Sequence, residues 1–251
     1  MRHIFAGVIL AVLSMTAHTT ELTILSAGAM QPGIEKVITQ FEKNTQHHVK
    51  VQFGTGPQLA ERLSSGQLAD IFVAPNGLLE DQIKKNIVQN DTKVYIGKVG
   101  VGVTVRNSLA NPNMSNVESL KDNLLRAQSI VYNKASTGIY IEKLIEKLGI
   151  AAELKDKTTR YDNGEKVLLH VIGGKGNEIG LAAITEIKLY EDKGLKLVGP
   201  LPTEVQNYTS YSAGLMNVKD QTQVSAAVAK EFMEYLKSKS SQALIKSVGI
   251  E

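Results

Sequence analysis

The spacing of hydrophobic residues along the first third of the chain alternates between two patterns. Short apolar or alternating stretches at 22–25, 47–53 and 71–74 predict β-strands. Between them, apolar residues recur at helical spacing from Ile34 to Phe41, and leucines at 59 and 63 indicate a second helix. Strands that alternate with helices predict an α/β fold with a largely parallel sheet.

A long extended segment, 94–105, follows this first group. Gly97, Gly100 and Gly102 lie inside the segment, and glycines within a strand weaken it and often mark bends. A chain that passes from one lobe to another needs a long bent strand of this kind. We therefore expect this segment to cross between two lobes.

A second α/β group follows the crossing segment. The pattern predicts strands at 130–132 and 179–184, a short strand with a turn at 197–202, and a return strand at 210–216. Helices are expected at 138–148, 165–172 and 222–238, with a short last helix that ends near Val248. The two groups are similar in kind but not in sequence.

The first nineteen residues have the features of a secretory signal. Arg2 and His3 precede the apolar run 4–13, and small residues follow up to Thr19. The apolar run is about half the length that a membrane span needs, although an N-terminal anchor is the alternative. No cysteine follows the run, which excludes a lipoprotein anchor. We expect residues 1–19 to be a cleaved signal peptide and the mature chain to be a soluble exported protein.

Composition and charge narrow the possible functions. The 251 residues include 28 Lys and Arg against 25 Asp and Glu, a net charge of +3. This balance gives no electrostatic reason to expect nucleic-acid binding. The absence of cysteine excludes disulfides, thiolate zinc sites, iron–sulfur clusters and cysteine nucleophiles.

The sequence carries no recognisable catalytic motif. It has no G-x-S-x-G elbow and no P-loop, and the glycine-rich run at 174–180 precedes a strand, unlike a dinucleotide-binding turn. His47 and His48 lie where a helix ends, which favours solvated histidines over metal ligands, and His170 is expected to pack against its helix face. We therefore expect no enzyme activity, no metal site and no cofactor.

Four loops rich in small polar residues each precede a predicted helix. They cover 26–30, 54–58, 135–138 and 162–164. Helix N-termini present free backbone N–H groups and a positive dipole end, so several that converge can hold an anion. Each loop alone is explained as well by an ordinary helix cap or turn. Two such loops from each lobe predict a ligand cleft.

At these residues the chain resembles the molybdate-binding-protein-like group of periplasmic solute-binding proteins of ABC transporters. The stretches that carry the resemblance follow one another in order over nearly the whole mature chain: 25–30, 53–60, 68–75, 136–140 and 164–168. The resemblance implies a type II periplasmic binding protein fold, with two Rossmann-like α/β lobes joined by two crossover hinge strands. By that analogy, one lobe holds 21–98 plus 206–251, the other holds 99–205, and the lobes close on ligand.

The resemblance also implies a set of ligand-binding residues. Thr55, Ser136 and Thr137 would donate side-chain hydrogen bonds, and the backbone N–H groups of Ala29, Met30 and Gly138 would add more. The full set is Gly28, Ala29, Met30, Thr55, Gly56, Ser136, Thr137, Gly138, Asn163 and Thr185.

The chain matches the pattern of molybdate-binding members only partly. Ala29 stands where a first-loop serine is expected, and the usual second-loop hydroxyl falls on Gly56 or its neighbour Thr55. The position of a tyrosine on a later strand falls on Ala183, with Thr185 and Glu186 nearby. The lost hydroxyls imply a roomier pocket. A protonatable oxyanion would favour an acceptor in the cleft, and Glu186 or Glu165 would then matter.

The leading hypothesis is an exported, monomeric binding protein of an ABC transporter. It would bind a small anion such as molybdate or tungstate between the lobes and present it to a membrane permease. The alternatives are the same fold binding a small organic carboxylate, a non-transport ligand sensor or adhesin, and an exported enzyme on the same fold.

Overall fold

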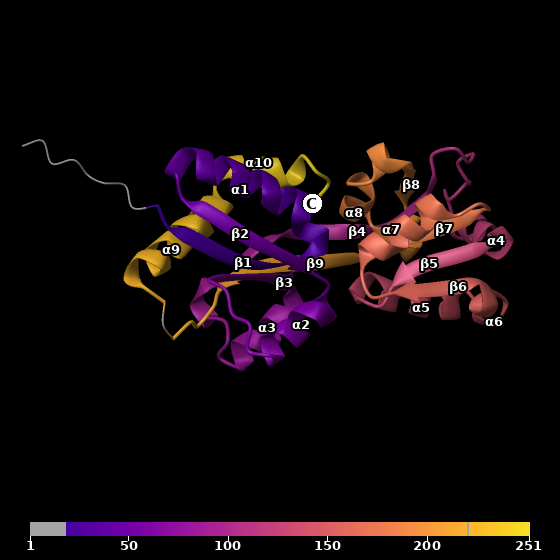
Figure 1. Ribbon diagram of the computed structural model, residues 1–251. Helices are drawn as coiled ribbons and strands as arrows, with labels where there is room; N and C mark the ends of the chain where they lie inside the picture. The colour runs from indigo at the N-terminus through magenta and orange to yellow at the C-terminus, as the bar shows by residue number, and fades with distance from the viewer. Residues whose placement is uncertain (1–18, 220) are drawn as a thin grey trace, which may run out of the picture.

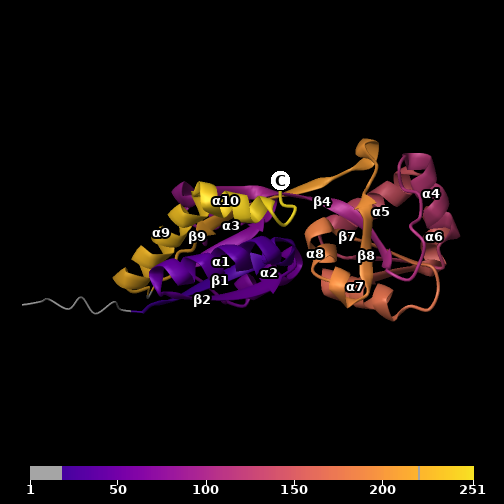
Figure 2. The same ribbon diagram turned by 90° about the horizontal axis from the view of Figure 1, so that it is seen from above.

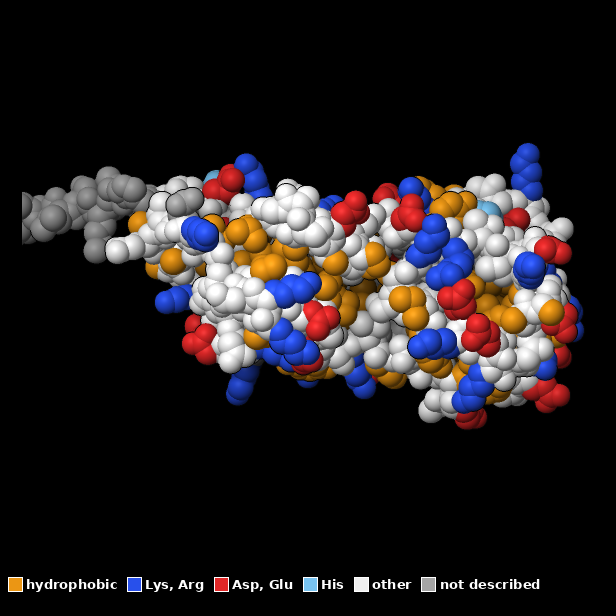
Figure 3. Space-filling model, turned by 90° about the horizontal axis from the view of Figure 1, so that it is seen from below, with side chains coloured by type: hydrophobic (Ala, Val, Ile, Leu, Met, Phe, Trp, Pro, Cys, Tyr) orange, Lys and Arg blue, Asp and Glu red, His pale blue; other side chains and the backbone are white. Residues whose placement is uncertain are grey.

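The computed structural model describes residues 19–219 and 221–251 (Figure 1). The predicted signal peptide, apart from Thr19, lies outside these residues. Within the described part of the chain, no helix is long and apolar enough to cross a membrane. Figure 3 shows basic and acidic side chains interspersed on one face of the molecule, in keeping with the near-neutral net charge.

The described residues form a nine-stranded sheet that runs through both halves of the molecule. Along the sheet the strand order is β2-β1-β3-β9-β4-β7-β5-β6, and β8 pairs with β4. The strands are β1 (Glu21–Ala27), β2 (His48–Gly54), β3 (Ile71–Pro75), β4 (Val94–Arg106), β5 (Ser129–Asn133), β6 (Thr158–Tyr161), β7 (Glu178–Ala183), β8 (Leu195–Pro200) and β9 (Tyr208–Leu215).

The sheet is parallel at its two ends and antiparallel in the middle. Strand β1 pairs in parallel with β2 and β3, and β5 pairs in parallel with β6 and β7. Strands β9 and β4 make the antiparallel pairings to β3, β7 and β8 and to each other. The expected largely parallel sheet is therefore wrong for the centre, because the two strands that link the halves run in opposite directions.

Strands β4 and β9 connect the two halves (Figures 1 and 2). Strand β4 pairs with β9 from Val94 to Gly100 and then with β7 and β8 up to Arg106. The predicted long crossing segment is confirmed. At Gly97, where a register shift falls, a Cβ would lie 2.5 Å from Ile250 and 2.8 Å from the Glu251 carbonyl oxygen. A glycine at this position lets the C-terminal residues pack directly on the crossing strand.

Helices cover both faces of the sheet in each half. In the first half, α1, α9 and α10 form one layer, while α2 and α3 lie on the other side (Figure 1). The helices are α1 (Gln31–Thr45), α2 (Gly56–Ser64), α3 (Asn76–Lys84), α4 (Val117–Arg126), α5 (Ser136–Lys147), α6 (Ala151–Leu154), α7 (Gly164–Gly173), α8 (Ile184–Lys188), α9 (Gln223–Lys237) and α10 (Lys239–Lys246). Short 3-10 turns include η1 (Gly28–Met30), which leads directly into α1.

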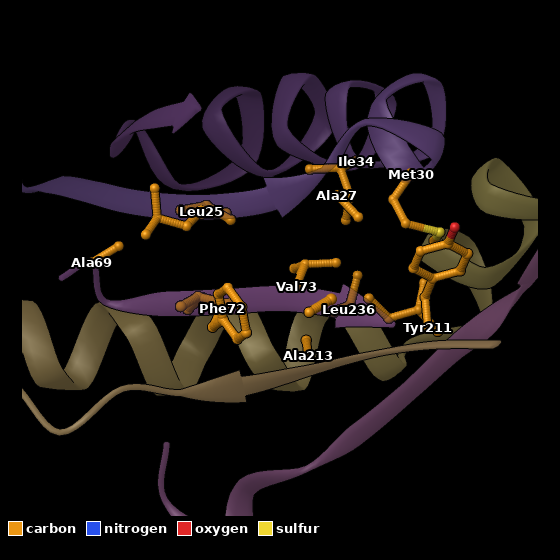
Figure 4. Packing of buried hydrophobic residues seen from close by; sticks show 14 of the residues in the cluster. Leu25, Ala27, Met30, Ile34, Ala69, Phe72, Val73, Tyr211, Ala213 and Leu236 are labelled. Atoms are coloured by element: carbon orange, nitrogen blue, oxygen red, sulfur yellow. The ribbon is translucent and has the colours of Figure 1, made fainter. Parts of the chain in front are cut away.

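Each half has its own hydrophobic core. The first core contains Phe41, Phe72 and Phe232 (Figure 4 shows Phe72 and neighbouring residues), and the second contains Val103 and Ile130. Phe232 comes from α9 and meets the Phe41 ring edge-on at 5.0 Å, so the C-terminal helix returns to the first core. Full burial of one such side chain contributes about 2 kcal/mol. A smaller third cluster, formed by α7, α8 and neighbouring strands, also lies in the second half.

Candidate functional site

Loops from both halves meet in a cleft at the junction. Its inner cavity is lined by Ala27, Gly28, Ala29, Gly54, Thr55, Gly56, Pro75, Asn133, Ala135, Ser136, Thr137, Ala183, Glu186 and Tyr211. An outer cavity of about 260 Å³ shares Gly28, Gly54, Thr55 and Glu186 with it and extends to Asn163 and Gly164. Because the two cavities share these residues, they form one continuous cleft.

Four helices begin at the inner cavity with an N-cap residue that has no capping side chain. The residues that precede η1, α3, α5 and α8 are Ala27, Pro75, Ala135 and Ala183, and none of them makes a side-chain cap of its own. All four line the inner cavity. Free first-turn N–H groups and the positive ends of the helix dipoles favour an anion at this point.

Two further helices that begin at the cleft, α2 and α7, are capped by a side chain in the ordinary way. The Thr55 hydroxyl accepts from Gln58 N–H, and the Gln58 side chain accepts from Thr55 N–H at 2.9 Å, which forms a capping box. Asn163 accepts from Lys166 N–H at 2.9 Å. Thr55 keeps its hydroxyl hydrogen for a ligand, whereas the Asn163 carbonyl oxygen is committed to α7.

Asn133 organises the N-terminus of α5 from the end of β5. Its Oδ1 accepts from Ala135 N–H at 3.0 Å and from Gly138 N–H at 3.1 Å. A Cβ at Gly138 would lie 1.6 Å from the Asn133 carbonyl oxygen, so only glycine fits there. The Gly138 N–H, expected to serve the ligand, therefore serves Asn133, and the N–H groups of Ser136 and Thr137 stand nearer the cavity.

The structure brings most of the sequence-predicted residues together and places three elsewhere. Gly28, Ala29, Thr55, Gly56, Ser136 and Thr137 line the inner cavity and Asn163 the outer one. Met30, Gly138 and Thr185 line neither cavity.

Two of these three residues have clear structural roles. The Met30 side chain is buried in the first core, at the end where Tyr211 also lies (Figure 4). Thr185 is fully buried, and its hydroxyl donates to the Ala29 carbonyl oxygen at 2.7 Å. Thr185 therefore ties α8 to η1 across the junction.

Glu186 stands inside the cleft between the two halves. A Cβ at Gly28 would lie 3.2 Å from its Oε1, and a Cβ at Gly164 would lie 2.3 Å from its Oε2. The carboxyl stays in contact with the cleft, but the surrounding protein desolvates it and raises its pKa to about 7. A hydrogen bond from the Ala183 backbone offsets part of this rise. Sequence reasoning named Glu186, together with Glu165, as the acceptor that a protonatable oxyanion would favour, but did not include it in the set of ligand-binding residues.

Tyr211 is a site residue that sequence reasoning missed. It reaches the inner cavity from β9, is only 3% exposed, and lies beside the Ser136 and Thr209 hydroxyls. Burial raises the pKa of its phenol above the usual range. The tyrosine position inferred from the resemblance, Ala183, contributes only a methyl group, so the phenol in this cleft comes from a crossing strand.

Two α/β halves, two antiparallel crossing strands and a cleft lined by helix N-termini define a type II periplasmic binding protein. The chain belongs to the family of bacterial extracellular solute-binding proteins, whose profile matches residues 22–251. It is a solute-binding protein of the ABC-transporter type.

The chain is similar to proteins that are named for different solutes or activities. The chain is 25% identical to an aconitate isomerase from Pseudomonas sp., over 92% of this chain and 88% of that protein. It is 23% identical to the molybdate-binding protein ModA of Haemophilus influenzae, over 93% of this chain and 91% of that protein. The solved structure of the Azotobacter vinelandii periplasmic molybdate-binding protein superposes with a TM-score of 0.74 at 16% identity, covering 92% and 98% of the two chains.

Proposed function

We propose that this protein binds a small anion in the cleft and delivers it to the membrane permease of an ABC transporter. The observation that carries the proposal is the convergence on the inner cavity of four helix N-termini whose N-cap residues have no capping side chain. Uncapped N–H groups favour an acceptor ligand, and the dipoles favour negative charge. A signal peptide at residues 1–19 and a periplasmic location belong to the same proposal.

The ligand lies between lobe 21–98 plus 206–251 and lobe 99–205. The N–H groups of Gly28, Ala29, Ser136 and Thr137 and the hydroxyls of Thr55 and Thr137 donate to it. Because these donors come from both lobes, the bound anion favours the closed arrangement. The permease then recognises the closed form, and the protein acts as a monomer.

The proposal includes two chemical classes of ligand, a tetrahedral oxyanion and a small organic carboxylate. Relatives named for molybdate favour a molybdate- or tungstate-type oxyanion. The relative named for aconitate, and the methyl groups of Ala29 and Ala183 in the inner cavity, favour a small organic carboxylate. A carboxylate places its apolar carbons against such methyl groups, whereas a tetrahedral oxyanion has none to place there.

Thermal unfolding with a panel of anions tests the proposal. Molybdate, tungstate, sulfate, phosphate and small carboxylates are added to residues 20–251, and the expected result is a rise in Tm with one chemical class. A ligand that binds only the folded state at about 100 times its Kd stabilises by about 2.7 kcal/mol. A Tm that no anion raises would contradict anion binding.

Isomerisation of a carboxylate is a second candidate function, favoured by one observation. Glu186 has a pKa of about 7 and faces the cleft, which suits a group that takes up and releases a proton, and one relative is named an isomerase. Incubation with cis-aconitate in D₂O, followed by NMR, tests this function. Deuterium incorporation or a trans product that Glu186→Gln abolishes would support the isomerase function. An unchanged spectrum with the wild-type protein would contradict it.

A further inference from the structure

A bound anion in this cleft has a carboxylate as its neighbour. Glu186 lines both the inner and the outer cavity, and its two oxygens face Gly28 on one side and Gly164 on the other. The absence of side chains at these two glycines is what gives the carboxylate its room. An anion held by the N-termini of η1 and α5 therefore lies next to Glu186.

No described residue forms an ion pair with Glu186. The Arg62 guanidinium of α2 lies near the cleft, since a Cβ at Gly54 would be 3.5 Å from its Nη1, but it is not paired with the Glu186 carboxylate. Tyr211 approaches from β9, Glu165 from α7, and Tyr190 from the end of α8, where its hydroxyl donates to Glu165 at 3.1 Å. Lys188, on the same helix, is exposed and reaches toward Gly249 instead. Among the described residues, Ala183 N–H is the one group that lowers the Glu186 pKa.

The Glu186 carboxylate, which has no ion-pair partner among the described residues, interacts differently with two kinds of anion. A fully ionised oxyanion such as sulfate or molybdate offers only acceptors, so it repels the ionised carboxylate or requires it to take up a proton. An anion with its own O–H group can donate that hydrogen to the carboxylate while its charged end accepts from the helix N-termini. Such a hydrogen bond is charge-assisted and strong.

We propose that Glu186 makes the cleft selective for anions that bring a hydrogen-bond donor, such as a hydroxy acid or a monoprotonated oxyanion, over fully ionised acceptor-only oxyanions. The inference rests on the proposed anion-binding function and names the ligand class of the same site. Glu186 acts here as a specificity-determining residue that contacts the ligand.

Matched ligand pairs test the selectivity by titration calorimetry. Lactate with propionate, and malate with succinate, differ by one hydroxyl, and sulfate and molybdate serve as acceptor-only probes. At about pH 8 the hydroxy member should bind the wild-type protein at least about tenfold tighter. Glu186→Gln should reduce this ratio several-fold, because the amide oxygen accepts only a neutral hydrogen bond. Hydrogen phosphate, compared with sulfate, separates a monoprotonated oxyanion from a hydroxy acid.

The pH profile provides a second readout. Above about pH 7, the wild-type Kd for sulfate or molybdate should rise by about tenfold per pH unit, because binding then requires proton uptake. Glu186→Gln should make this Kd independent of pH.

The Glu186→Gln variant should keep the fold. Glutamine has the same shape as glutamate and can still accept from Ala183 N–H. Glu118→Gln, at an exposed first-turn glutamate of α4, is the matched control and should change neither readout.

The outcomes separate this inference from the function on which it rests. If sulfate and molybdate bind tightly with no pH dependence and hydroxy acids have no advantage, anion binding stands and the role of Glu186 is wrong. If no anion binds the wild-type protein or the Glu186→Gln variant, the anion-binding function itself fails, and this inference fails with it.

Discussion

Thr137 carries the clearest side-chain contribution to the proposed site. It is 7% exposed, lines the inner cavity and lies in the first turn of α5. Thr137→Val removes the hydroxyl with little change in volume, so ligand affinity should fall by about tenfold or more, as for a lost hydrogen bond to a charged group. Calorimetry with the best anion of the panel measures the loss. Thr39→Val, at an exposed position of α1, is the control and should bind the anion with wild-type affinity. If both variants bind with the same affinity, the proposed position of the site is wrong.

Glu186 also predicts how stability depends on pH. Its folded pKa is raised from 4.5 to about 7, so the folded state holds the proton that the unfolded state has already released between these values. The stability that protonated Glu186 supplies is therefore complete below about pH 4.5, falls as pH rises, and is lost above about pH 7, a total of about 3 kcal/mol. Denaturant unfolding should find Glu186→Gln more stable than wild type at about pH 8, with the gain shrinking toward pH 5. A gain that is the same at both pH values would contradict the raised pKa.

At the scale of elements, the sequence predicted the regular strands and long helices better than the short connecting helices. The helix α3 begins at Asn76, inside a Pro-Asn-Gly stretch that is typical of a turn. Sequence reasoning missed α4 although Leu120 and Leu124 recur there at helical spacing, and α6, with four residues, is too short to carry an apolar period. Residues 179–184 were expected to be one strand, but β7 ends at Ala183 and α8 begins at Ile184. An apolar run alone does not distinguish a strand from a short buried helix.

The convergence of the cleft could be predicted only in outline. Loops with recognisable caps, at Thr55 and Asn163, were identified correctly as helix starts because Thr and Asn are preferred cap residues. Of the other helix starts at the inner cavity, those after Ala27 and Ala135 were also expected, from their small polar loops. Those after Pro75 and Ala183 were not, because neither residue has a capping side chain to give a local signal. Their meeting point depends on tertiary packing, as does the arrival of Tyr211 from a distant strand.

Gly102 links the crossing strand to the helix that carries Glu186. A Cβ there would lie 2.8 Å from Ile184 and 2.9 Å from Ile187, both on α8. Gly102→Ala should therefore displace α8 and reduce the free energy of unfolding by about 1–3 kcal/mol, as overpacking does. Denaturant unfolding measures the loss, and anion affinity should fall with it. Gly77→Ala, where a Cβ meets nothing within 4 Å, should be neutral or stabilising, and a similar loss in both variants would contradict the close packing at α8.

At the scale of the whole molecule, the proposed lobes should move as two bodies about β4 and β9. The Thr185 hydroxyl bonds to the Ala29 carbonyl across the junction, so this contact belongs to the closed arrangement. Small-angle X-ray scattering should show a smaller radius of gyration with saturating anion than without. Thr185→Val should weaken ligand binding by a factor of about five, the worth of one neutral hydrogen bond, although Thr185 does not line the cleft. An unchanged radius in the wild-type protein would contradict closure.

The four helix starts around the inner cavity whose N-cap residues have no capping side chain also have a consequence for engineering and evolution. A side-chain cap at such a position is worth about 1 kcal/mol of stability, so the empty protein forgoes stability that ordinary residues could supply. Ala135→Ser should raise the Tm of the ligand-free protein and weaken its response to anion. The new hydroxyl can accept from Thr137 N–H, which the ligand would otherwise use, whereas Gly138 N–H already donates to Asn133. Stabilisation by consensus caps would therefore erode transport, and thermostable variants of this protein should be sought away from the cleft.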